Sequence, residues 1–186
     1  MPAAHIHMSF AHRWQAEILP GRPLILPPRH FIYPQEVEEV ERGALELLIR
    51  PEPGDPFLAT CALGFRDPAA PTGVWSAPSP KEICAVSGGY AYVIDSSTPE
   101  RFTMIPYRPV LDVRPAPSAG LLLFVSHRSI LAWGRNGQAW ESEKLSDEGV
   151  TITGMEEATL HGLGWNRISD RETPFALDLA TGRVLP

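Results

Sequence analysis

A series of short apolar segments, each bounded by a tight polar turn, is the sequence feature that most constrains the fold. It is clearest where the apolar runs Leu121–Val125 and Ile130–Trp133 flank the polar turn Ser126–Ser129. A turn with glycine at both ends, at 134–137, then leads into a third short strand that carries Trp140. Segments of this length with turns of this kind are typical of an antiparallel β-meander. We therefore expect a mostly all-β protein.

Prolines are concentrated in the first part of the chain and argue against long helices there. Thirteen of the 20 prolines fall within the first 80 residues, and each one removes a backbone N–H donor. We predict that residues 1–33 form a proline-rich extended arm with little strand pairing. Its apolar pieces Ile18-Leu19 and Leu24-Ile25-Leu26 need cover. The arm is therefore expected to lie across the main body or across a partner subunit.

One short helix is predicted, near residues 34–43. Pro34 suits the first helical position, and the three glutamates that follow it favour a helix N-terminus. Gly43 is then the C-terminal cap, and a strand follows at 45–50. The alternative is a single helix that continues to Ile49.

Strand patterns recur along the rest of the chain. The glycine pair Gly88-Gly89 predicts a tight hairpin turn with positive φ between two of these strands. The expected strands lie at residues 57–65, 74–81, 82–87, 90–95, 101–106, 110–114, 149–153, 157–165, 175–179 and 183–185.

The strand patterns form an internal repeat. Residues 82–95 align without a gap on residues 121–134, at an offset of 39 residues. A third, looser copy requires a longer loop at 165–173. About 40 residues per four-stranded unit is the spacing of propeller blades. We expect one β-rich domain, residues 34–186, with repeats near 82–106, 121–145 and 157–186.

A resemblance to a known architecture supports the repeat. The run FALDLATGRVL, residues 175–185, resembles the corner between the third and fourth strands of quinoprotein-type propeller blades, and ILAWGRNGQAWES is a looser version of it. The resemblance covers about residues 82–186. It implies antiparallel meanders of propeller-blade type, in an open or incomplete propeller-like or sandwich arrangement, because three or four units are few for a closed ring. The chain is also similar to a bacterial protein family of unassigned activity, and that similarity implies no reaction.

Composition limits the classes of partner and the cellular setting. The net charge is -6, from 16 basic and 22 acidic residues, which disfavours binding to nucleic acid or to an anionic membrane through a broad basic face. No stretch approaches ~18 apolar residues and no signal-peptide pattern is present, so a soluble, cytoplasmic protein is expected. The two cysteines, Cys61 and Cys84, lie in apolar strands and are predicted to be buried free thiols.

No pattern of catalytic or metal-binding residues is found. The histidines His5, His7 and His12 lack an accompanying acidic or cysteine ligand, so no metal site is predicted. Ser126 and His127 are adjacent, and adjacent side chains on an extended backbone point apart. Nucleotide-binding and calcium-binding motifs are absent. We predict no catalytic residues and no cofactor.

The polar segment 161–172 is the strongest candidate for a binding surface. It combines tryptophan and arginine, a common composition of recognition surfaces, and Gly162 and Gly164 allow close approach of the backbone. Trp133 and Trp140 lie in strands and are expected in the core, whereas Trp75 and Trp165 are candidates for contact with a ligand. The predicted binding residues are Trp75, His161, Trp165, Arg167, Asp170 and Arg171.

These observations favour a non-enzymatic β-repeat module that binds another protein or associates with itself. One alternative is a small-ligand-binding protein or enzyme with a pocket near the 161–172 segment. A second alternative is a toxin-neutralising or regulatory partner of another protein.

Overall fold

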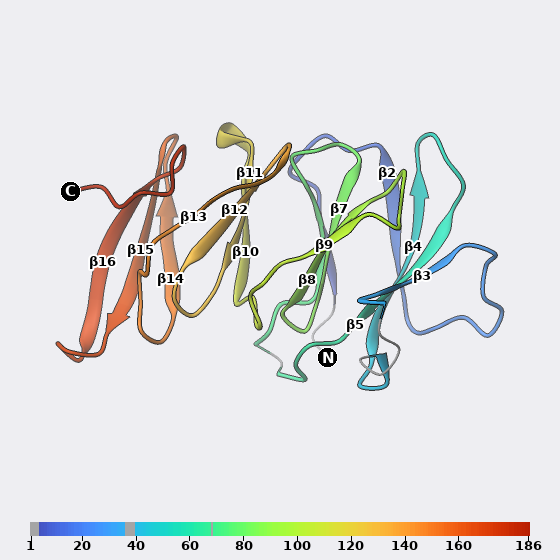
Figure 1. Cartoon of the computed structure of the whole chain (residues 1–186), viewed down its shortest axis with the longest axis horizontal. Coiled ribbons are helices and arrows are strands. Elements are labelled where there is room, and N and C mark those ends of the chain that lie inside the picture. Colours follow the sequence, from blue (N-terminus) through green and yellow to red (C-terminus); the bar gives the residue numbers. More distant parts are fainter. Residues whose placement is uncertain (1–3, 36–39, 68) are drawn as a thin grey trace. The chain divides into compact units, whose positions relative to one another are not determined.

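The computed structural model describes residues 4–35, 40–67 and 69–186, and they form an all-β structure (Figure 1). The chain divides into two compact units, Met1–Pro109 and Val110–Pro186. Each unit contains two β-sheets built mainly from antiparallel strands. The prediction of an all-β protein is confirmed.

The described residues of the first unit form nine strands in two sheets. One sheet has the order β2-β4-β5-β3, and the other has the order β1-β6-β7-β8-β9. The strands are β1 His5–His7, β2 Trp14–Leu19, β3 His30–Tyr33, β4 Ala44–Pro51, β5 Phe57–Ala62, β6 Gly73–Ser76, β7 Glu82–Ser87, β8 Tyr90–Asp95 and β9 Phe102–Met104.

The hairpin β7–β8 matches its prediction to the residue. Its strands pair from Glu82 with Asp95 through Ser87 with Tyr90. Gly88 and Gly89 adopt φ values of 56° and 78°, a region that glycine enters at little cost. A two-residue turn of this kind fixes the register of the strands that it joins.

The first 33 residues pair more extensively than the sequence indicated. They supply β1, β2 and β3, and β2 pairs with β4 over six residues. The expectation of little strand pairing is therefore wrong for this segment. The reason is the placement of the prolines, because Pro20, Pro23, Pro27 and Pro28 all fall in the connection between β2 and β3.

The helix predicted near residues 34–43 is not confirmed. Its central residues, 36–39, lie outside the described part of the chain. Among the residues that are described, Gly43 donates a hydrogen bond to Val40 O at 3.0 Å and has a φ of 122°. The strand β4 follows at once, so the alternative of a helix continuing to Ile49 is wrong.

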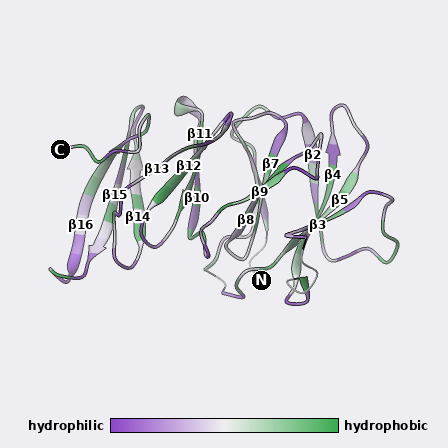
Figure 2. Cartoon of the chain, viewed as in Figure 1, coloured by the Kyte–Doolittle hydropathy of each residue, from purple (hydrophilic) through white to green (hydrophobic). Residues whose placement is uncertain are grey.

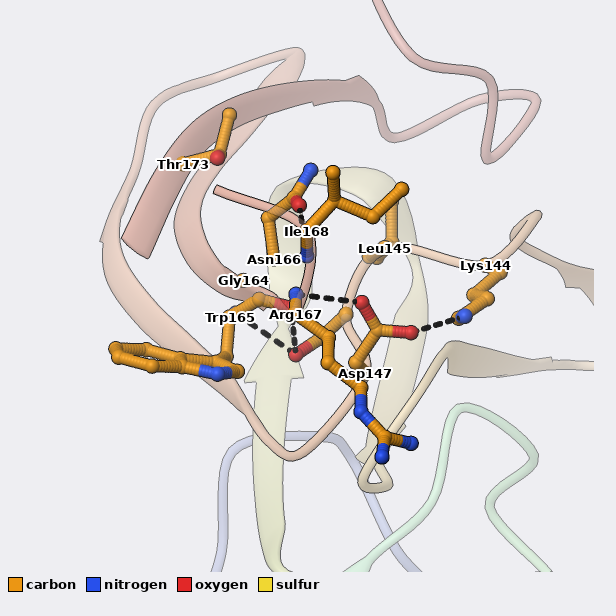
Figure 3. Close-up of a pocket in the computed structure, with 10 residues that line it drawn as sticks. Lys144, Leu145, Asp147, Gly164, Trp165, Asn166, Arg167, Ile168 and Thr173 are labelled. Atoms are coloured by element: carbon orange, nitrogen blue, oxygen red, sulfur yellow. Dashed lines mark hydrogen bonds and ion pairs between the residues drawn. The ribbon is translucent and has the colours of Figure 1, made fainter. Parts of the chain in front are cut away.

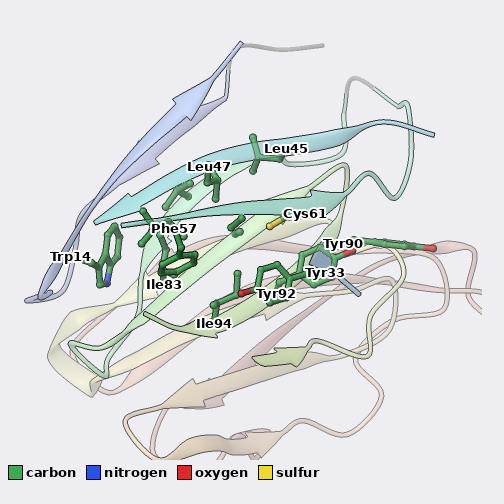
Figure 4. Packing of buried hydrophobic residues seen from close by; sticks show 14 residues of the cluster. Trp14, Tyr33, Leu45, Leu47, Phe57, Cys61, Ile83, Tyr90, Tyr92 and Ile94 are labelled. Atoms are coloured by element: carbon green, nitrogen blue, oxygen red, sulfur yellow. The ribbon is translucent and has the colours of Figure 1, made fainter. Parts of the chain in front are cut away.

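The core of the first unit lies between its two sheets (Figure 4). Alternate residues of β4 and β5, such as Leu47 and Phe57, meet alternate residues of β7 and β8, such as Ile83 and Tyr92. The polar atoms of the buried aromatic side chains also form hydrogen bonds. Trp14 Nε1 donates to Glu82 O at 3.0 Å, and the Tyr92 hydroxyl donates to Ala62 O at 3.1 Å. The core therefore combines apolar burial with hydrogen bonds that specify how the sheets meet.

A buried carboxylate fastens the β2–β3 connection to its sheet. Glu46 on β4 has a side chain only 5% exposed, and its Oε1 accepts a hydrogen bond from Arg22 Nε at 3.0 Å. Thr60 donates to Glu46 Oε2 at 2.6 Å. His30 Nε2 lies 2.8 Å from Thr60 Oγ1, and because the Thr60 hydrogen is used, Nε2 must be the donor. Burial, and then the nearby Arg22, lowers the pKa of His30.

The second unit contains two smaller sheets. They have the orders β10-β11-β12-β13 and β14-β15-β16, with neighbouring strands antiparallel throughout. The strands are β10 Asp112–Ala116, β11 Leu121–Val125, β12 Ile130–Gly134, β13 Gly137–Glu141, β14 Val150–Met155, β15 Thr159–Asn166 and β16 Arg171–Asp178. A 3-10 turn, Pro117–Ala119, precedes β11, and Val184 forms an isolated bridge with Leu177.

The core of the second unit is formed by Val, Leu and Trp side chains from both of its sheets, among them Leu123, Trp140, Leu160 and Leu177. Trp140 Nε1 donates to Leu179 O at 2.8 Å, which ties the sheets together. Trp133 is also buried. The prediction that Trp133 and Trp140 are core residues is confirmed.

Removal of Arg22 is expected to destabilise the protein more than removal of an exposed arginine. Arg22→Ala leaves the Glu46 carboxylate buried without its cation. We expect a loss of about 1–3 kcal/mol in the free energy of unfolding, below the ~3–5 kcal/mol of a fully buried pair, because the Arg22 side chain is 42% exposed. The matched control is Arg50→Ala, which breaks the Arg50–Glu17 pair between side chains 43% and 56% exposed. This control should lose less than about 1 kcal/mol. Urea denaturation measures both values, and equal losses would contradict the role of Glu46.

The two thiols are expected to be inert in the folded protein. Cys61 and Cys84 are buried free cysteines, as predicted, and burial raises the pKa of both thiols far above the ordinary 9.0. A thiol-specific reagent at pH 8 should modify neither until the chain is unfolded.

The raised pKa values also make stability depend on pH. Near pH 9 the two thiols ionise in the unfolded chain and stay protonated in the folded one. Their contribution to the free energy of unfolding is therefore fully present below about pH 9 and is lost as the pH rises above it. The free energy of unfolding of the variant Cys61→Ala/Cys84→Ala, measured by urea denaturation, should fall less steeply between about pH 9 and 10 than that of the parent chain.

Candidate functional site

An open hollow of about 590 Å³ lies on the surface of the second unit (Figure 3). It is formed by residues 144–147, which precede β14, and by residues 164–168 at the end of β15, with Thr173 on β16. We call it the Trp165 hollow. Two of the residues predicted to bind, Trp165 and Arg167, lie in its wall.

Ser146 holds the two sides of the Trp165 hollow together. Its side chain is buried, and its Oγ accepts hydrogen bonds from the backbone N–H of Trp165 at 2.8 Å and of Gly149 at 3.1 Å. The N–H of Asp147 donates to Trp165 O at 2.8 Å. The segment before β14 is therefore attached to the backbone of Trp165 by one side-chain and one backbone hydrogen bond.

Asp147 fixes the turn that follows β15. Its Oδ2 accepts the backbone N–H of Arg167 at 2.9 Å, and its Oδ1 pairs with Lys144 Nζ. The Arg167 N–H first, and then the Lys144 ammonium, hold the pKa of Asp147 below its ordinary value. Both carboxylate oxygens of Asp147 are therefore used to hold the surrounding structure (Figure 3).

The segment predicted as a longer loop, residues 165–173, is a long β-hairpin instead. The pairing of β15 with β16 continues to Asn166 opposite Arg171. Asn166 Oδ1 accepts the N–H of Ile168 at 3.0 Å, which closes the turn, and Asp170 adopts a φ of 52°. Asn and Asp favour such turns because their side chains bond the nearby backbone and tolerate the left-handed region. Only four residues, 167–170, remain outside the paired strands.

The two glycines of β15 allow the close approach that the sequence suggested. A Cβ at Gly164 would lie 2.0 Å from the carbonyl oxygen of Leu145. A Cβ at Gly162 would lie 2.3 Å from the ring of Phe175. Gly164 therefore lets the segment before β14 lie against β15, and this contact forms the floor of the Trp165 hollow.

The structure brings together some of the residues predicted to bind and separates others. His161 lies on the same face of β15 as Trp165, with its Nε2 3.9 Å from Glu156 Oε1. Asp170 lies in the hairpin turn, and Arg171 begins β16 at its hydrophilic end (Figure 2). Neither lines the Trp165 hollow. The indole of Trp165 and the guanidinium of Arg167 extend in different directions (Figure 3).

Trp75, the remaining candidate, belongs to the first unit. It lies on β6 and is only 7% exposed. The exposed ring of His7 stacks on it, with ring centroids 4.8 Å apart and planes inclined by 16°. Its contact surface is therefore already occupied by a neighbouring strand of the same unit.

Sequence reasoning missed the most exposed apolar residue in the wall of the Trp165 hollow. Ile168 is 98% exposed at the tip of the β15–β16 hairpin. A lone isoleucine within the polar turn Asn-Arg-Ile-Ser-Asp was the available signal. Nothing in the sequence indicated that the hollow would also include Leu145, Ser146 and Asp147, because these residues lie about 20 positions before those that they contact.

A second, smaller cavity of about 180 Å³ lies in the first unit, beside Ile18, Leu45 and Ser87. The Ser87 hydroxyl is fully buried and has no hydrogen-bond partner among the described residues. Within residues 4–35, 40–67 and 69–186, no group of three His, Cys, Asp or Glu side chains is placed to hold a metal ion.

Comparisons with protein-family models, with curated proteins and with solved structures give no match to this chain. In the part of the chain that the structure describes, no helix has the length and apolar composition needed to cross a membrane.

Gly164→Ala is expected to disrupt the floor of the Trp165 hollow. The added Cβ would collide with the Leu145 carbonyl, a backbone atom that cannot rotate away. We expect a loss of about 1–3 kcal/mol in the free energy of unfolding, as for overpacking in a core. The control is Gly154→Ala on the adjacent strand β14, where a Cβ would meet nothing within 4 Å. Denaturant titration of both variants tests the contact, and a loss at Gly154 as large as that at Gly164 would refute it.

Proposed function

We propose that this chain is a non-enzymatic recognition module that binds a protein segment at the Trp165 hollow. The observation that supports the proposal most is that the polar side chains around the hollow already form hydrogen bonds to the backbone. Ser146, Asp147 and Asn166 all use their side-chain oxygens to hold the local backbone. The Ser146 hydroxyl and the Asp147 carboxylate, which could otherwise act as a nucleophile or a base, are therefore committed to structure.

The side chains that face solvent at the Trp165 hollow are better suited to binding a ligand than to catalysis. Ile168 offers an exposed aliphatic surface, and Trp165 a half-buried aromatic one. Arg167 is exposed, and its guanidinium forms no ion pair with another described residue. Tryptophan and arginine are enriched at the energetic centres of protein interfaces. A free guanidinium pairs well with a carboxylate, so the proposed ligand is a peptide segment with an apolar residue beside an acidic one.

We further propose that the sheets are units of propeller-blade type, used as a scaffold for this surface. This part of the proposal is supported by the meanders β7-β8-β9, β11-β12-β13 and β15-β16, whose residues fall within the three predicted repeats. In each meander, consecutive strands are neighbours in the sheet. Such scaffolds carry their binding residues on the turns between strands, where Arg167 and Ile168 lie.

Selection from a library of displayed random peptides tests the proposed function. Purified chain is immobilised, and the affinity of the selected peptides is measured by fluorescence polarisation. Trp165→Ala and Arg167→Ala should each weaken binding by about 10-fold or more, as truncation of central interface residues does. The control Arg135→Ala removes an exposed arginine from the turn between β12 and β13 and should leave the affinity unchanged. Peptides that bind all three variants as tightly as the parent chain would place the recognition surface elsewhere.

A further inference from the structure

The cavity of about 180 Å³ in the first unit lies at one end of the core between the two sheets. Its wall includes Ile18 near the end of β2 and Leu45 near the start of β4, which are neighbours in one sheet. It also includes Ser87 at the end of β7 and Thr72, which directly precedes β6, in the other sheet. We call this space the Ser87 cavity. Both sheets of the first unit therefore contribute to its wall.

A buried hydroxyl distinguishes the Ser87 cavity from an ordinary gap in packing. Ser87 is fully buried, and its Oγ has no hydrogen-bond partner among the described residues. Successive side chains of a strand alternate in direction, so Ser87 faces the same way as Ile83 and Ala85, which pack in the core. Its hydroxyl therefore points between the sheets. A buried hydroxyl without a partner is unfavourable, so a ligand that supplies a partner gains an interaction that the free chain lacks.

The other polar side chains of the wall already have partners. Glu46 accepts hydrogen bonds on both of its carboxylate oxygens, and Thr72 Oγ1 accepts the N–H of Gly88 at 2.9 Å. A buried water needs about two to four polar partners, whereas Ser87 offers one. The Ser87 cavity therefore suits an apolar molecule with one hydrogen-bonding group better than it suits water.

The rest of the wall sets the charge and size of the ligand. It is apolar and is formed by Ala4, Ile18, Leu19, Pro20, Ala44 and Leu45, together with Gly21. The charged residue of the wall, Glu46, already has its counter-ion in Arg22. A charged ligand would thus lose its hydration without gaining an opposite charge. At about 30 Å³ for each water, the space equals roughly six water molecules, which limits the ligand to a small molecule.

The Ser87 cavity has an exposed side through which a ligand can enter. Pro20 and Gly21, at the start of the β2–β3 connection, belong to the wall and are exposed. Arg22 follows them directly and pairs with Glu46 on β4. The segment beside the entrance is therefore fastened to the sheet, and the cavity extends from this exposed side to the buried hydroxyl of Ser87.

We infer that the Ser87 cavity binds a small neutral molecule that has an apolar body and one hydroxyl or carbonyl group, which pairs with Ser87 Oγ. The apolar body lies against Ile18 and Leu45, and the polar group reaches the end of β7. This site belongs to the first unit and is separate from the Trp165 hollow. The inference goes beyond the proposed function and does not depend on it.

Cyclopentanol and cyclopentane are matched probes for this site, because they share one ring and differ by a hydroxyl group. Each is titrated into the isotope-labelled full chain, and NMR follows the backbone amides of Leu45, Thr72 and Ser87. Both probes should shift these amides. The Kd of cyclopentanol should be on the order of 1 mM, as expected for a ligand of few atoms.

Variants at two buried serines test the role of the hydroxyl. Ser87→Ala should weaken the binding of cyclopentanol by about 2–10-fold, as the loss of one hydrogen bond does, and should not weaken that of cyclopentane. Ser96→Ala is the matched control, because Ser96 also has a buried Oγ without a partner among the described residues and does not line the cavity. It should leave the affinity for cyclopentanol unchanged. Ser87→Leu fills the cavity and should abolish the binding of both probes.

Three results would overturn the inference. The first is a parent chain whose amides at the cavity shift with neither probe. The second is an affinity for cyclopentanol that Ser87→Ala leaves unchanged, which would mean that the hydroxyl takes no part. The third is an equal loss of affinity in Ser87→Ala and Ser96→Ala. Thermal unfolding of each variant confirms that it is folded, and the comparison of the two alanine variants remains decisive if Ser87→Leu does not fold.

Discussion

The burial of one apolar face of each sheet against a second sheet is the interaction on which both units depend. A twisted antiparallel meander of three or four strands has one apolar face that it cannot cover by itself. In the first unit, Leu47 and Phe57 on one sheet cover Ile83 and Tyr92 on the other. In the second unit, Leu123 and Trp140 face Leu160 and Leu177. Each sheet is thus held by its neighbour, and the turns at the ends of the strands are free to carry other residues.

The Trp165 hollow shows how polar residues use that freedom. Ser146 and Asp147 belong to a connection between the two sheets of the second unit, and they bind backbone atoms at the end of β15. Their hydrogen bonds hold a four-residue turn, residues 167–170, whose side chains are exposed. The residues of the hollow therefore fall into two groups: Ser146 and Asp147 hold its shape, whereas the side chains of Arg167 and Ile168 face solvent.

Local patterns in the sequence predicted the hairpins. The features that depend on contacts between distant residues were not predicted. The β7–β8 hairpin was predicted to the residue because two glycines and alternating apolar residues specify it locally. The pairing of Trp14 with Pro51 in β2–β4 joins positions far apart in the chain, so the prolines nearby suggested an unpaired arm. At the site, composition identified Trp165 and Arg167. It could not identify Ser146, whose role depends on a contact with residue 165, nor separate Asp170 and Arg171 from the hollow, because the hairpin continues through a turn that was read as a loop.

The pair between Arg22 and the buried carboxylate of Glu46 is not explained by stability alone. Moving a carboxylate out of water is costly, and an apolar side chain at that position would serve the sheet about as well. The pair does what an apolar contact does poorly: it fixes one point of a flexible connection to one point on a strand, because a charge-assisted hydrogen bond tolerates little displacement. Thr60 and His30 extend the same restraint across the sheet to β3. The result is a loop that is held near one end and whose three aliphatic side chains, at residues 24–26, are exposed to water, a combination that stability alone does not favour.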